Sequence, residues 1–185
     1  MSREWYELGP FVVFDVETTG MSRTRDRIVQ LAARRIDTDG RISSFDSFVN
    51  PGRPIPLAAM RIHHITDAMV ANAPKFSDVG MRFLDFSEGA TLVAHNAIFD
   101  LGFLQESLNR CGLPLWQGRT MDSIPLTRRA FPGLPSYSLQ VLRTALDLDE
   151  PDGEILTAHR ADSDVVWTVR LLRKVLETLI ANSGE

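Results

Sequence analysis

Cysteine is nearly absent from this chain of 185 residues, because Cys111 is the only one. A single thiol rules out an internal disulfide and any zinc site built from several cysteines. Such scarcity also fits a reducing compartment, where structural disulfides are rare.

Long apolar runs are missing as well. No segment approaches the roughly 18 apolar residues of a membrane span, and the first ten residues carry Arg3, Glu4 and Glu7 in place of the apolar core of a signal peptide. We therefore expect a cytoplasmic protein without membrane contact. Repeats, low-complexity segments and linkers are absent too. At 44% hydrophobic and 24% charged residues, the composition predicts one globular domain over residues 1–185.

An excess of positive charge is the third absence, since the formal net charge is -4. This argues against a protein that holds nucleic acid by a large basic surface. It does not exclude a nucleic-acid enzyme. Two bound divalent cations would bring the formal charge to zero and would attract phosphate locally.

The stretch of residues 11–20, FVVFDVETTG, contains the first candidate site residues. Its apolar run between Gly9-Pro10 and Gly20 predicts a buried strand. Side chains two apart on a strand share a face, so Asp15 and Glu17 point the same way. Paired buried carboxylates need protons or cations, and a divalent metal is the favoured compensation. Taken alone, the pattern is also compatible with an ordinary strand end bearing two solvated acids.

The following segments predict an α/β domain. Residues 28–36 and 41–49 have the pattern of a β-hairpin, with Val29, Leu31 and Ala33 on one face. Amphipathic spacing predicts helices at 75–87, after residue 96 and from about 161. Residues 91–94 and 119–122 are expected to be short strands.

Two further acids stand near predicted helix starts. Asp100 falls in the first turn of the helix after residue 96, where the helix dipole favours an ionised carboxylate. In the sequence 159–164, HRADSD, His159 and Asp164 can converge if His159 lies in the loop and Asp164 in the helix. Asp162 competes for the metal role but is better placed as a cap or first-turn acid. Each acid alone is equally compatible with a purely structural role.

A pair of adjacent histidines, His63 and His64, precedes a possible helix cap. With no nearby cysteine or third histidine, the sequence leaves two alternatives: one packed and one exposed ring, or a contact with substrate.

Together, the motifs FDVETTG, HNAIFD and HRADSD resemble those of the DEDDh 3'-to-5' exonucleases, and most of all the proofreading subunit or domain of bacterial replicative DNA polymerases. The likeness runs from about Phe11 to Leu179. It implies a ribonuclease H-like fold, a mixed five-stranded sheet flanked by helices. It also implies a general base, His159, and four metal-binding acids: Asp15, Glu17, Asp100 and Asp164.

The resemblance also suggests substrate contacts. His63 matches the family histidine that contacts the terminal nucleotide, whereas His64 replaces a usual glycine and Tyr137 replaces a usual histidine. That glycine replacement leaves the backbone path of the loop uncertain. Hydrogen bonds to the 3' end are expected from Thr18, Thr19 and Asn96. Met21 and Phe103 are expected to wedge or stack on the last bases, although both also suit a core.

The implied reaction uses two Mg²⁺ or Mn²⁺ ions roughly 3.5 to 4 Å apart at the scissile phosphate. His159 would take the water proton, since histidine titrates near neutral pH. We expect a 5'-mononucleotide to leave a DNA 3' end, with single-stranded DNA as the partner and a DNA polymerase subunit as a further one. The sequence leaves two alternatives: an exoribonuclease that trims RNA 3' ends, or a binding module whose chemistry has lapsed.

Overall fold

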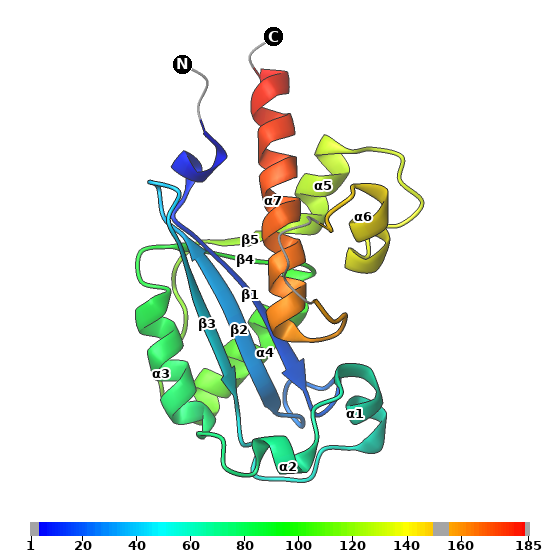
Figure 1. Cartoon of the computed structure of the whole chain (residues 1–185). Helices are drawn as coiled ribbons and strands as arrows, with labels where there is room; N and C mark the ends of the chain where they lie inside the picture. Colours follow the sequence, from blue (N-terminus) through cyan, green and yellow to red (C-terminus); the bar gives the residue numbers. More distant parts are fainter. Residues whose placement is uncertain (1–3, 150–155, 184–185) are drawn as a thin grey trace.

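The computed structural model describes residues 4–149 and 156–183. Its centre is a five-stranded sheet in the order β3-β2-β1-β4-β5 (Figure 1). The strands are β1 (Phe11–Thr18), β2 (Ile28–Ile36), β3 (Ile42–Phe48), β4 (Thr91–Ala94) and β5 (Thr120–Asp122). β1, β2 and β3 are antiparallel, β4 is parallel to β1, and β5 is parallel to β4. The predicted mixed sheet is confirmed.

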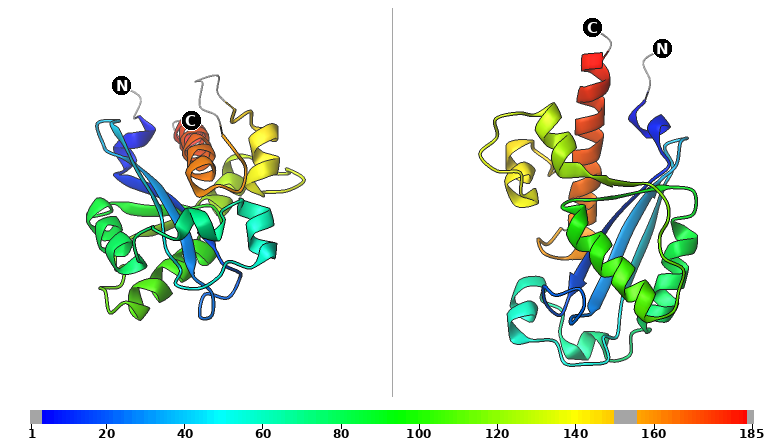
Figure 2. Two further views of the ribbon diagram at one scale, coloured as in Figure 1. Left: turned by 60° about the horizontal axis from the view of Figure 1, so that its bottom comes forward. Right: turned by 180° about the vertical axis from the view of Figure 1, so that it is seen from behind.

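Helices cover both faces of the sheet, as Figure 2 shows from two further sides. α3 and α4 pack on one face and α7 on the other, with α5 and α6 beside α7. After the 3-10 turn η1 (Trp5–Leu8), the helices are α1 (Leu57–His63), α2 (Asp67–Val70), α3 (Phe76–Phe86), α4 (Ala97–Arg110), α5 (Ser123–Ala130), α6 (Leu139–Ala145) and α7 (Ala161–Ser183).

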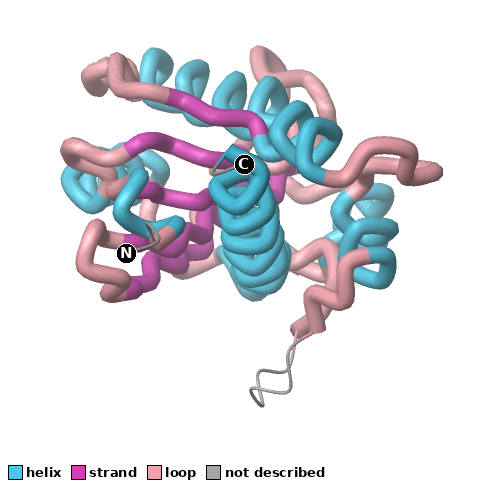
Figure 3. Tube along the Cα trace, turned by 90° about the horizontal axis from the view of Figure 1, so that it is seen from above, coloured by secondary structure: helices cyan, strands magenta, loops and turns pink. Residues whose placement is uncertain are grey.

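β1 alternates between two apolar cores. Val12, Phe14 and Val16 face the core under α3 and α4, whereas Phe11 and Val13 face the core under α7. Because side chains alternate along a strand, the next two residues on the α7 side are Asp15 and Glu17. Figure 3 shows α7 lying across that face of the sheet. The strand therefore carries its two acids directly from an apolar core to the sheet's end.

The β-hairpin is confirmed, but one detail of its predicted face is wrong. Leu31 and Ala33 share the core under α3 and α4, whereas Val29 packs in a separate cluster with α1 and α2. The β1–β2 register shifts between Glu17 and Thr18, so Glu17 faces Gln30 and Thr18 faces Ile28. This bulge turns Val29 away from its expected face.

No helix within the described residues is long and apolar enough to cross a bilayer.

Candidate active site

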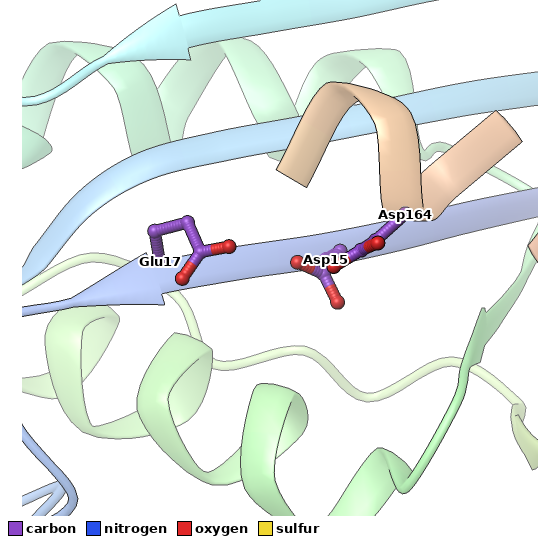
Figure 4. A group of neighbouring side chains, drawn as sticks. All are labelled: Asp15, Glu17 and Asp164. Atoms are coloured by element: carbon purple, nitrogen blue, oxygen red, sulfur yellow. The ribbon is translucent and has the colours of Figure 1, made fainter. Parts of the chain in front are cut away.

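Three carboxylates from two elements meet at the end of β1. Asp15 and Glu17 on β1 and Asp164 on α7 each place a carboxylate oxygen within 4.8 Å of the others. Figure 4 shows Asp15 and Asp164 turned toward each other, with Glu17 further along the same strand. Asp15 and Glu17 are half-buried, and Asp164 is 8% exposed. Such closeness opposes full ionisation of the three groups.

The start of α7 fixes the position of Asp164. Ala161 and Val165, on either side of it, are buried against the sheet. Asp164 lies in the first turn, as the sequence predicted, and a hydrogen bond from the His159 backbone stabilises its carboxylate. Its Oδ1 atom is buried without a hydrogen-bond partner within the part of the chain that the structure describes.

Asp100 reaches the same region from the opposite face of the sheet. It lies in the first turn of α4 and is 3% exposed. β4 pairs with β1 only up to Val13, so the later edge of β1 is open. There the Val16 N–H donates to Asp100 Oδ1 at 3.1 Å. Asp100 lies outside the 4.8 Å group, although its charge raises the pKa of Asp15.

All four acids have raised pKa values. Burial, followed by repulsion from Asp100, Glu17 and Asp164, holds the pKa of Asp15 well above its usual range. Burial raises the pKa of Glu17 to about 8, with further repulsion from Asp164 and Asp100. Burial likewise raises the pKa of Asp100 to about 8 and that of Asp164 to about 7. Without compensating positive charge, the fold therefore favours the protonated acids at neutral pH.

A divalent cation fits this group of acids. The unpartnered Asp164 Oδ1 is an available ligand atom, and carboxylate oxygens suit hard cations such as Mg²⁺ and Mn²⁺. A bound cation would also offset the repulsion that raises the pKa values. The cluster is thus chemically suited to metal.

His159 lies in the loop just before α7, where the sequence placed it. It is exposed, and its φ of 59° lies in the left-handed region. That bend allows its own backbone to stabilise the Asp164 carboxylate while its ring stays accessible to solvent. With His159 in the loop and Asp164 in the helix, the condition under which the two residues were expected to converge is met.

Thr18 and Thr19, expected to bind the substrate, form hydrogen bonds inside the protein. Thr18 Oγ1 donates to the Gly20 carbonyl at 2.6 Å. Thr19 Oγ1 donates to Asp26 Oδ1 at 3.3 Å and accepts from the Arg27 N–H at 3.0 Å. Both side chains are buried and shape the loop of residues 19–27. Direct contact with substrate stays a prediction for both.

Of the two adjacent histidines, His63 is packed and His64 is exposed. His63 Nδ1 accepts from the Ile65 N–H at 3.0 Å, so Nε2 carries the proton and donates to the Thr18 carbonyl at 3.2 Å. The Nε2 bond therefore joins α1 to the end of β1, while the Nδ1 bond fixes the ring to the backbone just after α1. A nucleotide contact by His63 stays a prediction and would have to use the ring face.

Asn96 borders a hollow of about 290 Å³ together with Met21, Arg23, Ile98, Phe99 and Phe103. Asn96 is exposed and so is Met21, with 81% of its surface accessible. Phe103, however, is 1% exposed in the core, and Phe99 lies beside it at 4.9 Å between ring centroids. Stacking on a base by Phe103 stays a prediction, whereas Phe99 is the more accessible ring.

Two further residues shape the site without standing out in the sequence. Asp122 caps α5 and also accepts hydrogen bonds from the backbone of Asn96 at 3.3 Å and Ala97 at 3.1 Å, which fixes the start of α4. The charge of Arg160 lowers the pKa of Glu17, against the larger effect of burial. Only its place next to His159 in the chain pointed to Arg160.

Comparison with known proteins gives one consistent result. The model of the exonuclease family RNase_T matches residues 12–172. A DNA polymerase III subunit epsilon-like protein of Rhodobacter capsulatus is 43% identical over 92% of this chain, which covers 24% of that relative. The DNA polymerase III subunit epsilon of Treponema pallidum is 34% identical over 95% of this chain and 78% of its own length. The chain thus spans about a quarter of the first of these relatives.

A solved structure agrees with these relatives. Exonuclease X, in complex with 5' overhanging duplex DNA, superposes with a TM-score of 0.71 at 33% identity, covering 95% of this chain and 93% of that one.

Proposed function

Since this chain belongs to the RNase_T family of exonucleases, we propose that it is a metal-dependent 3'-5' exonuclease that releases 5'-mononucleotides from DNA 3' ends. The observation that carries the proposal is the meeting of Asp15, Glu17 and Asp164, with Asp100 bonded to the strand between the first two. Acids whose pKa values burial raises to about 7 or 8 are typical of functional sites.

Asp15, Glu17, Asp100 and Asp164 would hold the divalent cations, two Mg²⁺ or Mn²⁺ ions. When bound, these ions supply Lewis-acid chemistry: they lower the pKa of water and offset charge on the phosphate and the leaving 3'-oxygen. Asp100 would be held in place by the Val16 N–H, and Asp164 by the His159 backbone. Preformed geometry of this kind reduces the reorganisation needed at the reacting phosphate.

The exposed ring of His159 would act as the general base that takes a proton from the attacking water. Its loop can move the ring while α7 keeps Asp164 fixed, since Asp164 lies within a long, packed helix. The hollow beside Asn96 and Phe99 would receive the terminal nucleotide.

DNA is the proposed substrate because Exonuclease X, which covers nearly the same length, was solved with duplex DNA. We extend the proposal to a single-stranded 3' end at the site itself, to association with a DNA polymerase subunit and to a place in the cytoplasm. The epsilon subunit of Treponema pallidum supports the last two, since it is named as a part of DNA polymerase III.

The test is a degradation series on a labelled single-stranded DNA, a primer duplex with a 3' mismatch and a short RNA of the same sequence. With Mn²⁺, we expect 5'-mononucleotides from DNA and at least tenfold slower release from RNA. Chelator should abolish release. Asp15→Asn should lower kcat/KM at least about 100-fold, since losing a cation ligand removes several kcal/mol of charge stabilisation.

A matched control is Asp39→Asn, which removes an exposed acid at the β2–β3 turn, remote from the site. It should cleave DNA at the parent rate. Equal rates on RNA and DNA would favour the exoribonuclease. DNA binding with no release under any metal would identify a lapsed module, and cleavage in chelator would overturn the metal mechanism.

A further inference from the structure

The loop of residues 19–27 joins β1 to β2 at one end of the sheet (Figure 2, left). It contains three arginines, at positions 23, 25 and 27. Arginines of the loop lie beside basic side chains from the segment after β3, from the N-cap position just before α3 and from α4. We call this group the loop cluster: Arg23, Arg25, Arg27, Arg53, Lys75 and Arg110.

Backbone carbonyls, rather than carboxylates, hold most of these arginines. Arg53 Nη1 donates to the Arg25 carbonyl at 2.7 Å, and Arg27 Nη1 donates to the same carbonyl at 3.0 Å. Arg110 Nη2 donates to the carbonyls of Arg23 at 3.3 Å and Thr24 at 3.1 Å. These bonds order the guanidinium groups but leave their charge uncompensated.

The neighbouring positive charges affect the pKa of Arg27. Its pKa is lowered by burial first and then by Arg110 and Arg53. Such repulsion opposes folding, so an arrangement of this kind is expected where an anion relieves it.

Few acids neutralise the loop cluster. Asp26 is turned into the loop, where it accepts from the Ser22 N–H at 2.8 Å and from Thr19. Glu106 pairs with Arg110 at 3.3 Å. Within the described ranges, Arg23, Arg25, Arg27 and Arg53 take part in no ion pair. A net positive area therefore remains on a chain whose formal charge is -4.

Arg23 connects this charge to the candidate active site. It lines the hollow of about 290 Å³ beside Asn96 and Phe99, and also a second hollow of about 620 Å³ along α4. Its side chain crosses α4 at Gly102, where an added Cβ would lie 3.0 Å from Arg23 Nη1. The glycine leaves room for the arginine, so the loop cluster borders the hollow proposed for the terminal nucleotide.

We infer that the loop cluster binds the backbone phosphates of the DNA that lies beyond the terminal nucleotide. The inference rests on the proposed function for the position of the 3' end. The charge itself selects the ligand: arginine side chains without acidic partners suit phosphodiester oxygens. An overall acidic protein can in this way hold a polyanion at one place.

The experiment compares Arg25→Gln/Arg53→Gln with the parent and with Arg119→Gln/Arg129→Gln, a control that removes the same charge from exposed sites remote from the loop. Binding of a fluorescein-labelled 12-nucleotide DNA is followed by anisotropy from 25 to 200 mM NaCl in EDTA. Each lost phosphate contact should lower the slope of log K against log salt by about 0.7. For Arg25→Gln/Arg53→Gln we expect the magnitude of the slope to fall by roughly 1.4 and the affinity at 50 mM NaCl to fall about tenfold. The control should keep the slope and affinity of the parent.

Arg25→Lys/Arg53→Lys retains the positive charge and should keep most of the parent's salt dependence. A thermal unfolding scan shows whether each variant is folded. Hydrolysis supplies a second measurement. The ratio of kcat/KM on the 12-nucleotide DNA to that on the p-nitrophenyl ester of thymidine 5'-monophosphate should fall about tenfold in Arg25→Gln/Arg53→Gln, as its affinity does.

The outcomes separate the two proposals. An unchanged slope in a folded Arg25→Gln/Arg53→Gln variant overturns the inference, whether or not DNA is cleaved. A reduced slope in a chain that hydrolyses neither substrate supports the loop cluster as a DNA-binding surface and overturns the exonuclease.

Discussion

Among single residues, Asp164 shows most directly that burial in the site disfavours an ionised carboxylate. Its carboxylate is 8% exposed, and burial raises its pKa to about 7. A bound cation would stabilise the ionised carboxylate, whereas the metal-free protein must bury that charge without the cation. Stability and activity therefore make opposite demands on this side chain.

Asp164→Asn should accordingly have two effects of opposite direction. Loss of a cation ligand should lower kcat/KM at least about 100-fold with Mn²⁺. In EDTA at pH 8.5 the neutral amide should raise the free energy of unfolding by about 2 kcal/mol, because the ionised acid no longer has to be buried. A melting curve should show Tm higher by roughly 4–8 °C.

Asp162→Asn provides the comparison, because Asp162 lies in the same turn of α7, is partly exposed and pairs with Arg160 at 3.5 Å. It should leave both rate and Tm close to those of the parent. Equal effects in both variants would show that the turn needs acids in general and that Asp164 has no separate role.

His64 is a non-glycine residue in a conformation that glycine adopts most easily. It follows α1 as its C-cap with φ 60° and ψ 15°, the left-handed conformation that glycine adopts most easily. The exposed histidine accepts this conformation at a cost of about 1–2 kcal/mol. A glycine at position 64 would adopt the same conformation without this cost.

At the scale of elements, β1, α4 and α7 bring their acids close together, so a rise in pH should destabilise the metal-free fold. Because the acids have raised pKa values, the folded state binds more protons than the unfolded state between about pH 4 and pH 8. The free energy of unfolding contributed by these groups is thus greatest below pH 4 and falls as pH rises through 7 to 8.

We expect Tm in EDTA to fall by roughly 4–8 °C between pH 5.5 and pH 8.5, which corresponds to about 2 kcal/mol for a domain of this size. Mn²⁺ at 1 mM should recover the loss at pH 8.5 and do little at pH 5.5, where protons compete for the ligands. A Tm in EDTA that rises across the same range would contradict the raised pKa values.

Elements were predictable where the pattern is local. The apolar run between Gly9-Pro10 and Gly20 predicted β1, and the apolar spacing from residue 161 predicted α7. The hairpin, β4 and the helix carrying Asp100 followed in the same way. Offsets along the chain also placed His159 in a loop and Asp164 in a helix.

Tertiary contacts decided the remainder. Thr18 and Thr19 resemble substrate ligands in sequence, yet the loop of residues 19–27 uses both hydroxyls. Phe103 has a helical spacing that suits either a core or a base, and α4 packs it inward. The loop cluster could not be predicted from the sequence, because its basic side chains come from four separated segments and the chain as a whole is acidic.

At the scale of the whole molecule, an apolar core joins α7 to one face of the sheet. Leu172 is fully buried among Phe11, Val13 and other residues of that core. Residues on the same face of α7 hold the turn that carries Asp164. The apolar core and the acid cluster therefore share a helix but occupy different parts of it.

Leu172→Ala should lower the free energy of unfolding by about 2–5 kcal/mol, because it leaves a cavity in a closed core. Tm should fall by at least roughly 4 °C, while kcat/KM at 20 °C stays within about twofold for the folded fraction. Leu57→Ala, at a position 68% exposed, should change stability by less than about 0.5 kcal/mol. Chemical unfolding curves would measure both. A strong loss of kcat/KM in folded Leu172→Ala would show that packing and chemistry are not separable.

The acids of the site are drawn from residues 15 to 164 of the chain. During synthesis on the ribosome, the strand bearing Asp15 and Glu17 emerges before α7, which carries the last of the four acids. A nascent chain consequently lacks the complete set of acids until α7 has left the exit tunnel and docked on the sheet.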